Sequence, residues 1–268
     1  MKRLLIIAVG IIFGIGSIYG QGDLNEQQKI FFRNEKSFAI LLNTDGFGLS
    51  YREGRRVDYL NKKLLEIDLG TLKHSKEVKL SNPAYPQTSG TFVFGKINST
   101  FFIRAGLGHQ HEIFKKADLG GVAIRYFYSA GPVFALYKPI YYKILDPVNA
   151  QGTQFTIINE KFDIKKHDPT MIYGRASFTK GLSETKLLPG LYGKGGFNFE
   201  YSKEDKVIHA IELGAQVNLF PKKIPMMATS GNKAIFFSLF ASYRFGVVID
   251  PLDPESNKFS NIFSRKKQ

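Results

Sequence analysis

Histidine is the residue type that could most directly support chemistry in this chain. One residue separates His109 from His111. In a strand, side chains two residues apart point to the same side, as a pair of metal ligands would. Glu112 is the carboxylate beside them, and the surrounding segment is polar. We interpret the pair as solvated histidines in a connection between strands, so we expect no metal site.

A lipid-deacylating barrel enzyme would need a serine and a histidine paired on its lipid-facing side. His209 shares the apolar face of its expected strand, but nothing in the sequence marks a serine partner. Gly193 to Gly196 lacks the strand–loop–helix context of a phosphate-binding loop. The chain has no cysteine, which excludes disulfides, thiol catalysis and thiolate metal sites. We therefore expect no catalytic residue, no cofactor and no enzyme activity, and we interpret His209 as interfacial.

Charged side chains in the middle of expected strands are the more informative set. Glu66 and Asp68 share one strand, and Lys96 and Arg104 share the next. If both strands direct these residues inward, the charges can pair across the interior of a barrel. The expected interior cluster is Glu66, Asp68, Lys96, Arg104, Arg125, Lys194 and Glu212.

This cluster has two interpretations, a polar channel or a salt-bridged plug. An eight-stranded barrel has an interior only just wide enough for side chains to fill. A buried charge left without its partner costs roughly 3–5 kcal/mol. We therefore favour a plug.

Strict alternation of apolar and polar residues defines the elements that position these charges. It is clearest over Thr91 to Leu107, Val207 to Leu219 and Ile235 to Phe245. The chain also contains 24 Phe, 13 Tyr and 26 Gly, a composition typical of β-sheet. Strands of about ten residues are long enough to cross a bilayer when tilted, and a sheet in lipid must close to pair its backbone groups. The pattern predicts an all-β transmembrane barrel.

Tyrosines near the ends of the apolar faces support this prediction. Tyr126, Tyr128, Tyr201 and Tyr243 lie where a membrane barrel carries its interfacial aromatic girdles. A soluble sandwich also alternates, but it does not explain these tyrosines together with charges in mid-strand.

The N-terminus has the organisation of a secretory signal peptide. Lys2 and Arg3 precede an apolar run from Leu4 to Gly16, and Gly20 is suited to the position before a cleavage site. Removal of residues 1–20 leaves 35 Lys and Arg against 23 Asp and Glu, a net charge of +12. Because the chain is exported, we expect its anionic partners to be outer-membrane lipid and lipopolysaccharide, and not nucleic acid.

The last expected strand carries a family resemblance. Tyr243-Arg244-Phe245 resembles the C-terminal insertion signal of bacterial outer-membrane proteins, although about 20 residues follow it here. The segments Phe220 to Pro225 and Gly190 to Lys194 are similar to those of small uncharacterised outer-membrane barrels of Bacteroidetes type. This resemblance implies a barrel in the cell outer membrane and no reaction. It assigns Tyr243 and Phe245 to the insertion signal.

The predicted architecture is an antiparallel up-and-down barrel of eight strands, or ten if turns occur near both Asp45 and Gly131. Its parts are a signal peptide (1–20), an N-terminal periplasmic segment (21–35), the barrel (36–247) and a polar C-terminal tail (248–268). Both termini should face the periplasm. The tail and the polar stretch 147–169 are expected to provide surfaces for partners.

The leading functional hypothesis is a non-enzymatic barrel that acts as a structural or accessory subunit of a larger outer-membrane complex, such as protein insertion or secretion machinery. Its partners would be other outer-membrane or periplasmic proteins. Two alternatives remain open at this stage, a small porin for solutes and a lipid-modifying barrel enzyme.

Overall fold

The computed structural model describes residues 34–117, 120–149, 154–202, 206–229 and 231–249. The predicted signal peptide, nearly all of the N-terminal segment and most of the C-terminal tail lie outside these residues. Within them, no helix combines the length and the apolar character needed to cross a membrane.

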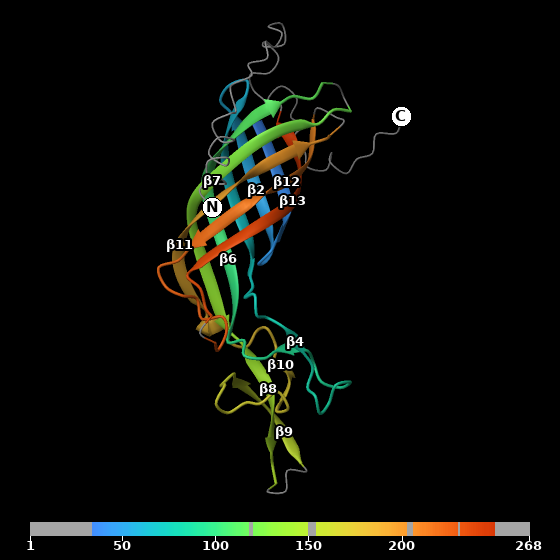
Figure 1. Cartoon of the computed structure of the whole chain (residues 1–268), viewed down its shortest axis with the longest axis vertical. Helices are drawn as coiled ribbons and strands as arrows, with labels where there is room; N and C mark the ends of the chain where they lie inside the picture. Colours follow the sequence, from blue (N-terminus) through green and yellow to red (C-terminus); the bar gives the residue numbers. More distant parts are fainter. Residues whose placement is uncertain (1–33, 118–119, 150–153, 203–205, 230, 250–268) are drawn as a thin grey trace, which may run out of the picture. The chain divides into compact units, whose positions relative to one another are not determined.

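Eight strands form a closed barrel in which every neighbouring pair is antiparallel (Figure 1). Each strand pairs with those before and after it among the eight, and the first pairs with the last, from Asn34 opposite Ile249 to Asn43 opposite Phe240. The predicted eight-stranded up-and-down barrel is confirmed. Its strands are β1 (Asn34–Asn43), β2 (Gly46–Arg56), β3 (Asn61–Leu72), β6 (Asn98–Phe114), β7 (Ala123–Pro139), β11 (Lys186–Glu200), β12 (Val207–Leu219) and β13 (Ile235–Ile249).

Of the two turns considered near Asp45 and Gly131, the structure contains only the first. Thr44 and Asp45 connect β1 to β2 in a tight hairpin. Gly131 instead lies in the middle of β7, which runs without a break through 17 residues and pairs with β6 and β11. A Cβ atom at Gly131 would lie 2.2 Å from the Ala105 carbonyl oxygen. This glycine therefore permits a close approach of two strands.

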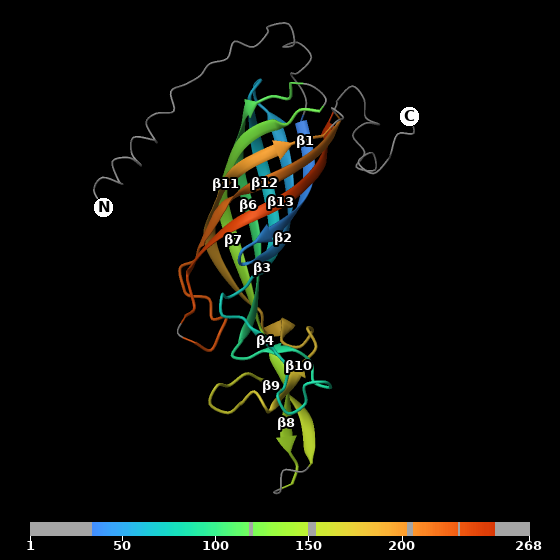
Figure 2. The ribbon, with the colours of Figure 1, turned by 45° about the vertical axis from the view of Figure 1, so that its right-hand side comes forward.

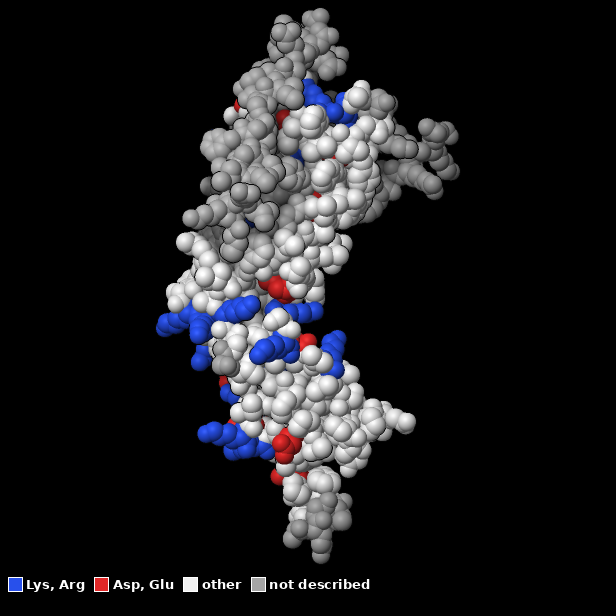
Figure 3. Space-filling model, in the orientation of Figure 1, with Lys and Arg blue, Asp and Glu red and all other residues white. Residues whose placement is uncertain are grey.

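The barrel wall has an apolar outside and a polar inside. Leu42, Leu107 and Phe237 point outward and are 63%, 73% and 67% exposed, whereas Glu66 and Glu212 point inward and are fully buried. A soluble barrel would show the opposite arrangement, because its apolar side chains fill the core. Where grey atoms do not cover the barrel in Figure 3, its outer wall is mostly white between the charged side chains at the two ends. This pattern matches a barrel surrounded by hydrocarbon.

The two ends of the barrel differ in the length of their connections. Short connections at 57–60, 115–122 and 201–206 occur at the end where β1 begins and β13 ends, here called the terminal end. Longer segments at 73–97, 140–185 and 220–234 lie at the opposite end, here called the loop end. Additional structure is therefore concentrated at the loop end.

Residues 140–185 form a small three-stranded sheet, here called the extension, with the strand order β10-β8-β9 (Figure 2). Its apolar core includes Phe92, Tyr142 and Phe162. The Tyr142 hydroxyl donates to the Val93 and Lys96 carbonyls at 2.9 and 2.8 Å, which ties the sheet to the segment before β6. The elements are β8 (Tyr141–Pro147), β9 (Phe155–Lys161), β10 (Ile172–Arg175), the short helix η2 (Leu182–Glu184) and the neighbouring pair β4 (Lys79–Leu80) and β5 (Phe92–Val93).

The extension modifies two expectations from the sequence. The predicted barrel range 36–247 encloses both the eight barrel strands and the extension. The stretch 147–169, noted as polar, contains strand β9. Short strands in a polar context give a weak alternation signal, and here they depend on packing against residues distant in sequence.

Close strand packing around Gly214 provides a test of the fold. A Cβ atom there would lie 2.2 Å from the Gly195 carbonyl oxygen and 2.8 Å from the Phe240 ring, whereas at Gly193 the nearest atom is 3.8 Å away. We expect Gly214→Ala to destabilise the barrel by about 1–3 kcal/mol through overpacking. Gly193→Ala, in the neighbouring strand, should be close to neutral. The heat-modifiable electrophoretic shift of the folded barrel measures both, and equal effects would contradict the packing argument.

Candidate functional site

Two buried glutamates lie at the centre of the barrel lumen. Glu212 accepts hydrogen bonds from Arg52 at 2.5 Å, from the Arg244 Nε at 2.9 Å and from Asn198 at 2.9 Å. Ser242 donates to the second oxygen at 3.1 Å. One carboxylate thus binds two guanidinium groups, which is the compensation that buried charges require.

Glu66 forms the second centre. It accepts from Arg52 at 2.9 Å, from Lys194 at 2.9 Å and from Ser129 at 3.0 Å. Lys194 also reaches the Asp68 carboxylate at 3.3 Å. Because Arg52 contacts both Glu66 and Glu212, the two centres form one network, which connects strands from opposite sides of the barrel.

A second layer lies beside this network, toward the loop end. The Arg104 guanidinium is 3.7 Å from Asp68 and donates to Gln216 at 2.7 Å. Its flat face lies 3.9 Å from the centre of the Phe102 ring and 5.5 Å from that of Tyr192. Stacking of this kind suits the weakly hydrated guanidinium group. The layer adds bulk to the filled interior.

A separate charge cluster lies near the terminal end. Arg125 binds Glu112 at 3.1 Å and also contacts Glu200. Lys116 reaches Glu200 at 2.8 Å. Arg125 was expected in the same cluster as Glu66, and the structure places it in this other one, because it lies near the beginning of β7.

Six of the seven expected cluster residues point into the barrel interior, with Arg125 near the terminal end, and the other five lie together in the central network and the layer beside it. These five are Glu66, Asp68, Arg104, Lys194 and Glu212.

Lys96 was expected in the lumen, and this prediction is wrong. Strand β6 begins at Asn98, so Lys96 lies in the segment before the barrel and pairs with Glu77. Burial lowers the pKa of Lys96, and the hydrogen bond to Glu77 opposes that shift. The alternation continues through residue 96, but the strand does not, because its partner β7 ends at Pro139 opposite Asn98.

The sequence analysis missed two central residues of the network, Arg52 and Arg244. Both are nearly fully buried, and each contacts both Glu66 and Glu212. The signal was present, because Arg52 alternates with the outward residues Leu49 and Tyr51 on β2. Period-2 alternation assigns both arginines to the interior face, but neither was named in the expected cluster.

The histidine pair lies in a strand and not in a connection, which corrects the sequence interpretation. His109 and His111 both project from the outer face of β6. The His111 Nδ1 is 2.8 Å from the Asn61 side-chain oxygen, and its ring lies 5.2 Å from that of Tyr126. Among the residues that the structure describes, no group of three or more potential metal ligands occurs.

These histidines belong to an aromatic band on the outer wall near the terminal end. His109 stacks with Tyr128, and His209 stacks with Tyr243. The His209 Nδ1 lies 2.8 Å from the Tyr243 hydroxyl oxygen. Amphipathic rings of this kind are typical of the membrane–water interface. The remaining rings of the band are Phe38, Tyr51, Tyr126, Tyr201 and Phe245.

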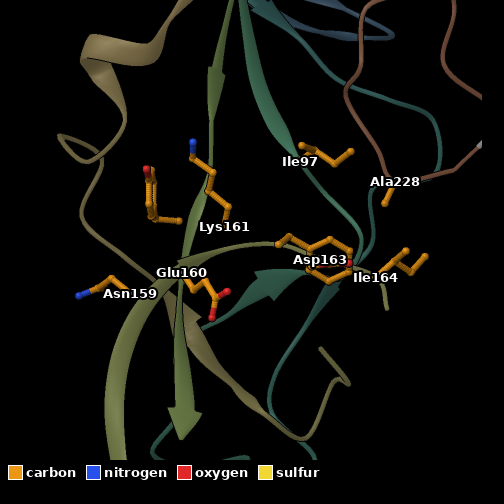
Figure 4. Close-up of a pocket in the computed structure, with 9 residues that line it drawn as sticks. Ile97, Asn159, Glu160, Lys161, Asp163, Ile164 and Ala228 are labelled. Atoms are coloured by element: carbon orange, nitrogen blue, oxygen red, sulfur yellow. The ribbon is translucent and has the colours of Figure 1, made fainter. Parts of the chain in front are cut away.

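The extension carries an open groove of about 630 Å³ (Figure 4). Beside it, Glu184 accepts a hydrogen bond from the Tyr141 hydroxyl at 2.5 Å and binds Lys161. The bond to Lys161 holds the pKa of Glu184 below its usual value, and the same bond raises the pKa of Lys161. The groove is lined by Ile97, Tyr141, Asn159, Glu160, Lys161, Phe162, Asp163, Ile164 and Ala228. The lining therefore combines apolar side chains with charged ones.

No protein-family model matches the chain, and no curated protein matches it in sequence. Similar solved structures include Neisserial surface protein A, with 10% identity, a TM-score of 0.35 and coverage of 81% of this chain and 97% of that chain. The N-terminal β-barrel domain of Pseudomonas aeruginosa OprF is 8% identical, with a TM-score of 0.34 and coverage of 81% of this chain and 97% of that chain. Ail of Yersinia pestis is 8% identical, with a TM-score of 0.35 and coverage of 82% of this chain and 98% of that chain. The architecture described above therefore rests on the strand order and register of this chain itself.

Removing Glu212 tests the lumen network. We expect Glu212→Ala to destabilise the barrel by about 3–5 kcal/mol, because Arg52 and Arg244 would stay buried with less compensation. The control is Glu53→Ala, on the outer face of β2, whose pair with Arg55 is solvent-exposed and is worth about 0–1 kcal/mol. Urea unfolding in detergent micelles measures both. A loss from Glu212→Ala no larger than that of the control would show that the network does not stabilise the barrel.

Proposed function

We propose that this protein is a non-enzymatic barrel of the cell outer membrane that acts as an accessory subunit of a larger complex, of the kind that inserts or secretes proteins. The filled lumen is the observation that carries the proposal. Arg52, Lys194 and Arg244 are paired with Glu66 and Glu212 through buried contacts. A solute passing through the lumen would have to break these pairs, which disfavours a porin. We therefore assign the function to the outer surfaces of the barrel and its connections.

The outer wall supports the membrane location. Its apolar side chains are exposed over the barrel, and the aromatic band surrounds part of the terminal end. Tyr243 and Phe245 are members of this band on the last strand, which is consistent with the proposed insertion signal. Residues 1–20 would direct export as a cleaved signal peptide.

The lengths of the connections support an orientation for the barrel. Outer-membrane barrels have short periplasmic turns and longer extracellular loops. The terminal end of this barrel has the short connections, so we place it in the periplasm with both chain termini. The extension then projects from the outer surface of the cell, where its partners would be surface-exposed proteins or outer-membrane lipids.

The extension offers an unpaired sheet edge to such a partner. Within the described residues, β9 pairs with β8 on one side only. Phe155 and Ile157 on this strand are exposed apolar residues. A free edge with exposed apolar side chains can receive an extended segment of another chain. We therefore place the contact with the partner protein on β9.

The proposed orientation can be tested with single cysteines, because the natural sequence contains none. A membrane-impermeant polyethylene-glycol maleimide should label Asn159→Cys, on the extension, in intact cells. Val57→Cys, exposed in a terminal-end connection, should react only after the outer membrane has been permeabilised. The opposite labelling pattern would place the extension in the periplasm.

The proposed role predicts that partner capture depends on β9. Phe155→Ser/Ile157→Ser should reduce co-purification by at least about tenfold, since burying one large apolar side chain contributes about 1.5–3 kcal/mol. Val148→Ser/Leu182→Ser removes two exposed apolar side chains of the extension that lie outside β9 and do not line the groove, so it is the matched control and should retain the partner. The measurement is crosslinking in intact cells, followed by quantitative mass spectrometry of material purified in mild detergent. A wild-type barrel that stays a lone monomer under these conditions would refute the proposed subunit role.

A further inference from the structure

The rim of the barrel has a notch at the loop end, between β13 and the β1–β2 hairpin. Strand β1 ends at Asn43 opposite Phe240, whereas β13 begins five residues earlier, at Ile235. On its other side, β13 pairs with β12 from its first residue, where Ile235 lies opposite Leu219. On the β1 side, the last backbone hydrogen bond runs from the Thr44 N–H to the Leu239 carbonyl, at 3.0 Å. One edge of β13 therefore rises above the hairpin without a neighbouring strand in the described part of the chain.

A pocket of about 300 Å³ occupies this notch. The hairpin residues Thr44 and Asp45 line it together with residues 73–75, Lys233 and residues 235–237. The Lys73 N–H donates to the Asp45 carbonyl at 2.7 Å, which fixes the segment after β3 against the hairpin. The pocket is thus built from three separate parts of the chain.

The lining combines free positive charge with apolar surface. Lys73 and Lys233 are exposed, and neither forms an ion pair with any described residue. The Lys73 Nζ lies 5.6 Å from the centre of the Phe47 ring on the outer wall. Ile235 and Phe237 also line the pocket and point toward the lipid-facing side. The notch is therefore open to the surface on which acyl chains would lie.

We propose that this notch binds the phosphate-bearing head of an outer-membrane lipid, with Lys73 and Lys233 holding the phosphate and with the acyl chains lying along Phe237 and the neighbouring wall. The inference rests on the proposed outer-membrane location. An anionic head suits two unpaired ammonium groups, and the exposed apolar wall below them suits hydrocarbon. Free phosphate would use only the first of these features.

Three further titratable groups bear on the charge of the notch. Asp45 opposes an anion, but both of its carboxylate oxygens are buried, and this burial raises its pKa. The His74 Nε2 is engaged with the Gly231 carbonyl at 3.0 Å. Glu77 accepts from the His74 N–H and also pairs with Lys96, which directs its charge away from the pocket. The two lysines are thus the charged groups available to a ligand.

The surrounding loop end is also basic. The segments 73–97, 140–185 and 220–234 carry 13 Lys and Arg against 6 Asp and Glu, and blue side chains gather at and beyond this end of the barrel in Figure 3. Such a field raises the local concentration of anionic headgroups. It does not select one site, which makes a charge-matched control necessary.

Native mass spectrometry of the full-length protein in detergent tests the proposal. The probes are bisphosphorylated lipid A, phosphatidylglycerol, phosphatidylcholine and glycerol 3-phosphate. We expect the two anionic lipids to bind, and phosphatidylcholine and chain-free glycerol 3-phosphate to bind at least about tenfold more weakly. Comparison of lipid A with phosphatidylglycerol identifies the source of the phosphate.

The variant Lys73→Gln/Lys233→Gln should weaken binding of the anionic lipids by about tenfold or more. Lys222→Gln/Lys223→Gln removes the same charge from exposed residues of the same rim that do not line the pocket, and it should change binding less than twofold. Heat-modifiable electrophoresis confirms that both variants are folded, and the single variant Lys233→Gln replaces the double if that one misfolds. Equal losses in the two double variants, or equal binding of phosphatidylcholine, would overturn the proposal. Because isolated protein is used, the result does not depend on a partner complex.

Discussion

The structure depends on the compensation of charge inside a barrel whose outside is apolar. Glu66 and Glu212 each bind two or more cationic side chains from other strands, and Arg52 links the two carboxylates. A buried ion pair adds little stability compared with an apolar core, but breaking it is costly. The network also disfavours shifted registers, because a strand shifted by one residue would direct its charged residue outward.

Closure of the sheet with eight strands determines the width of the lumen that side chains fill. Every backbone group at membrane depth must be paired within the sheet, so β1 must meet β13. Eight strands then leave an interior that side chains can fill. Glycines such as Gly131 and Gly214 allow neighbouring strands to approach where the interior is crowded. The result is a lumen crossed at its centre by buried ion pairs.

The two ends of the barrel then divide the remaining roles. The terminal end has short connections and an aromatic band, as expected of an interfacial anchor. The loop end carries the extension, the free edge of β9 and the basic notch at Lys73 and Lys233. A protein partner on the extension and a lipid in the notch use different surfaces. The two proposals therefore describe compatible contacts of one membrane subunit.

The sequence by itself determined the strands and the side to which most of their residues point. Alternation is a local property, so Glu66, Lys194 and Glu212 were assigned to the interior without knowledge of any pairing. The same rule covered Arg52 and Arg244, although their importance became visible only through their contacts. The all-β class and the eight-stranded option followed from the same pattern.

Only the tertiary structure decided where each strand begins and ends and what lies beyond it. Lys96 continues the alternation of β6 but falls outside the barrel, because the paired strand β7 stops at Pro139. His109 and His111 lie in β6 because β3 and β7 pair with that stretch on both sides. The extension and the rim notch have no local pattern, since packing and uneven strand lengths create them. Such features depend on contacts between residues far apart in the chain, which local periodicity does not encode.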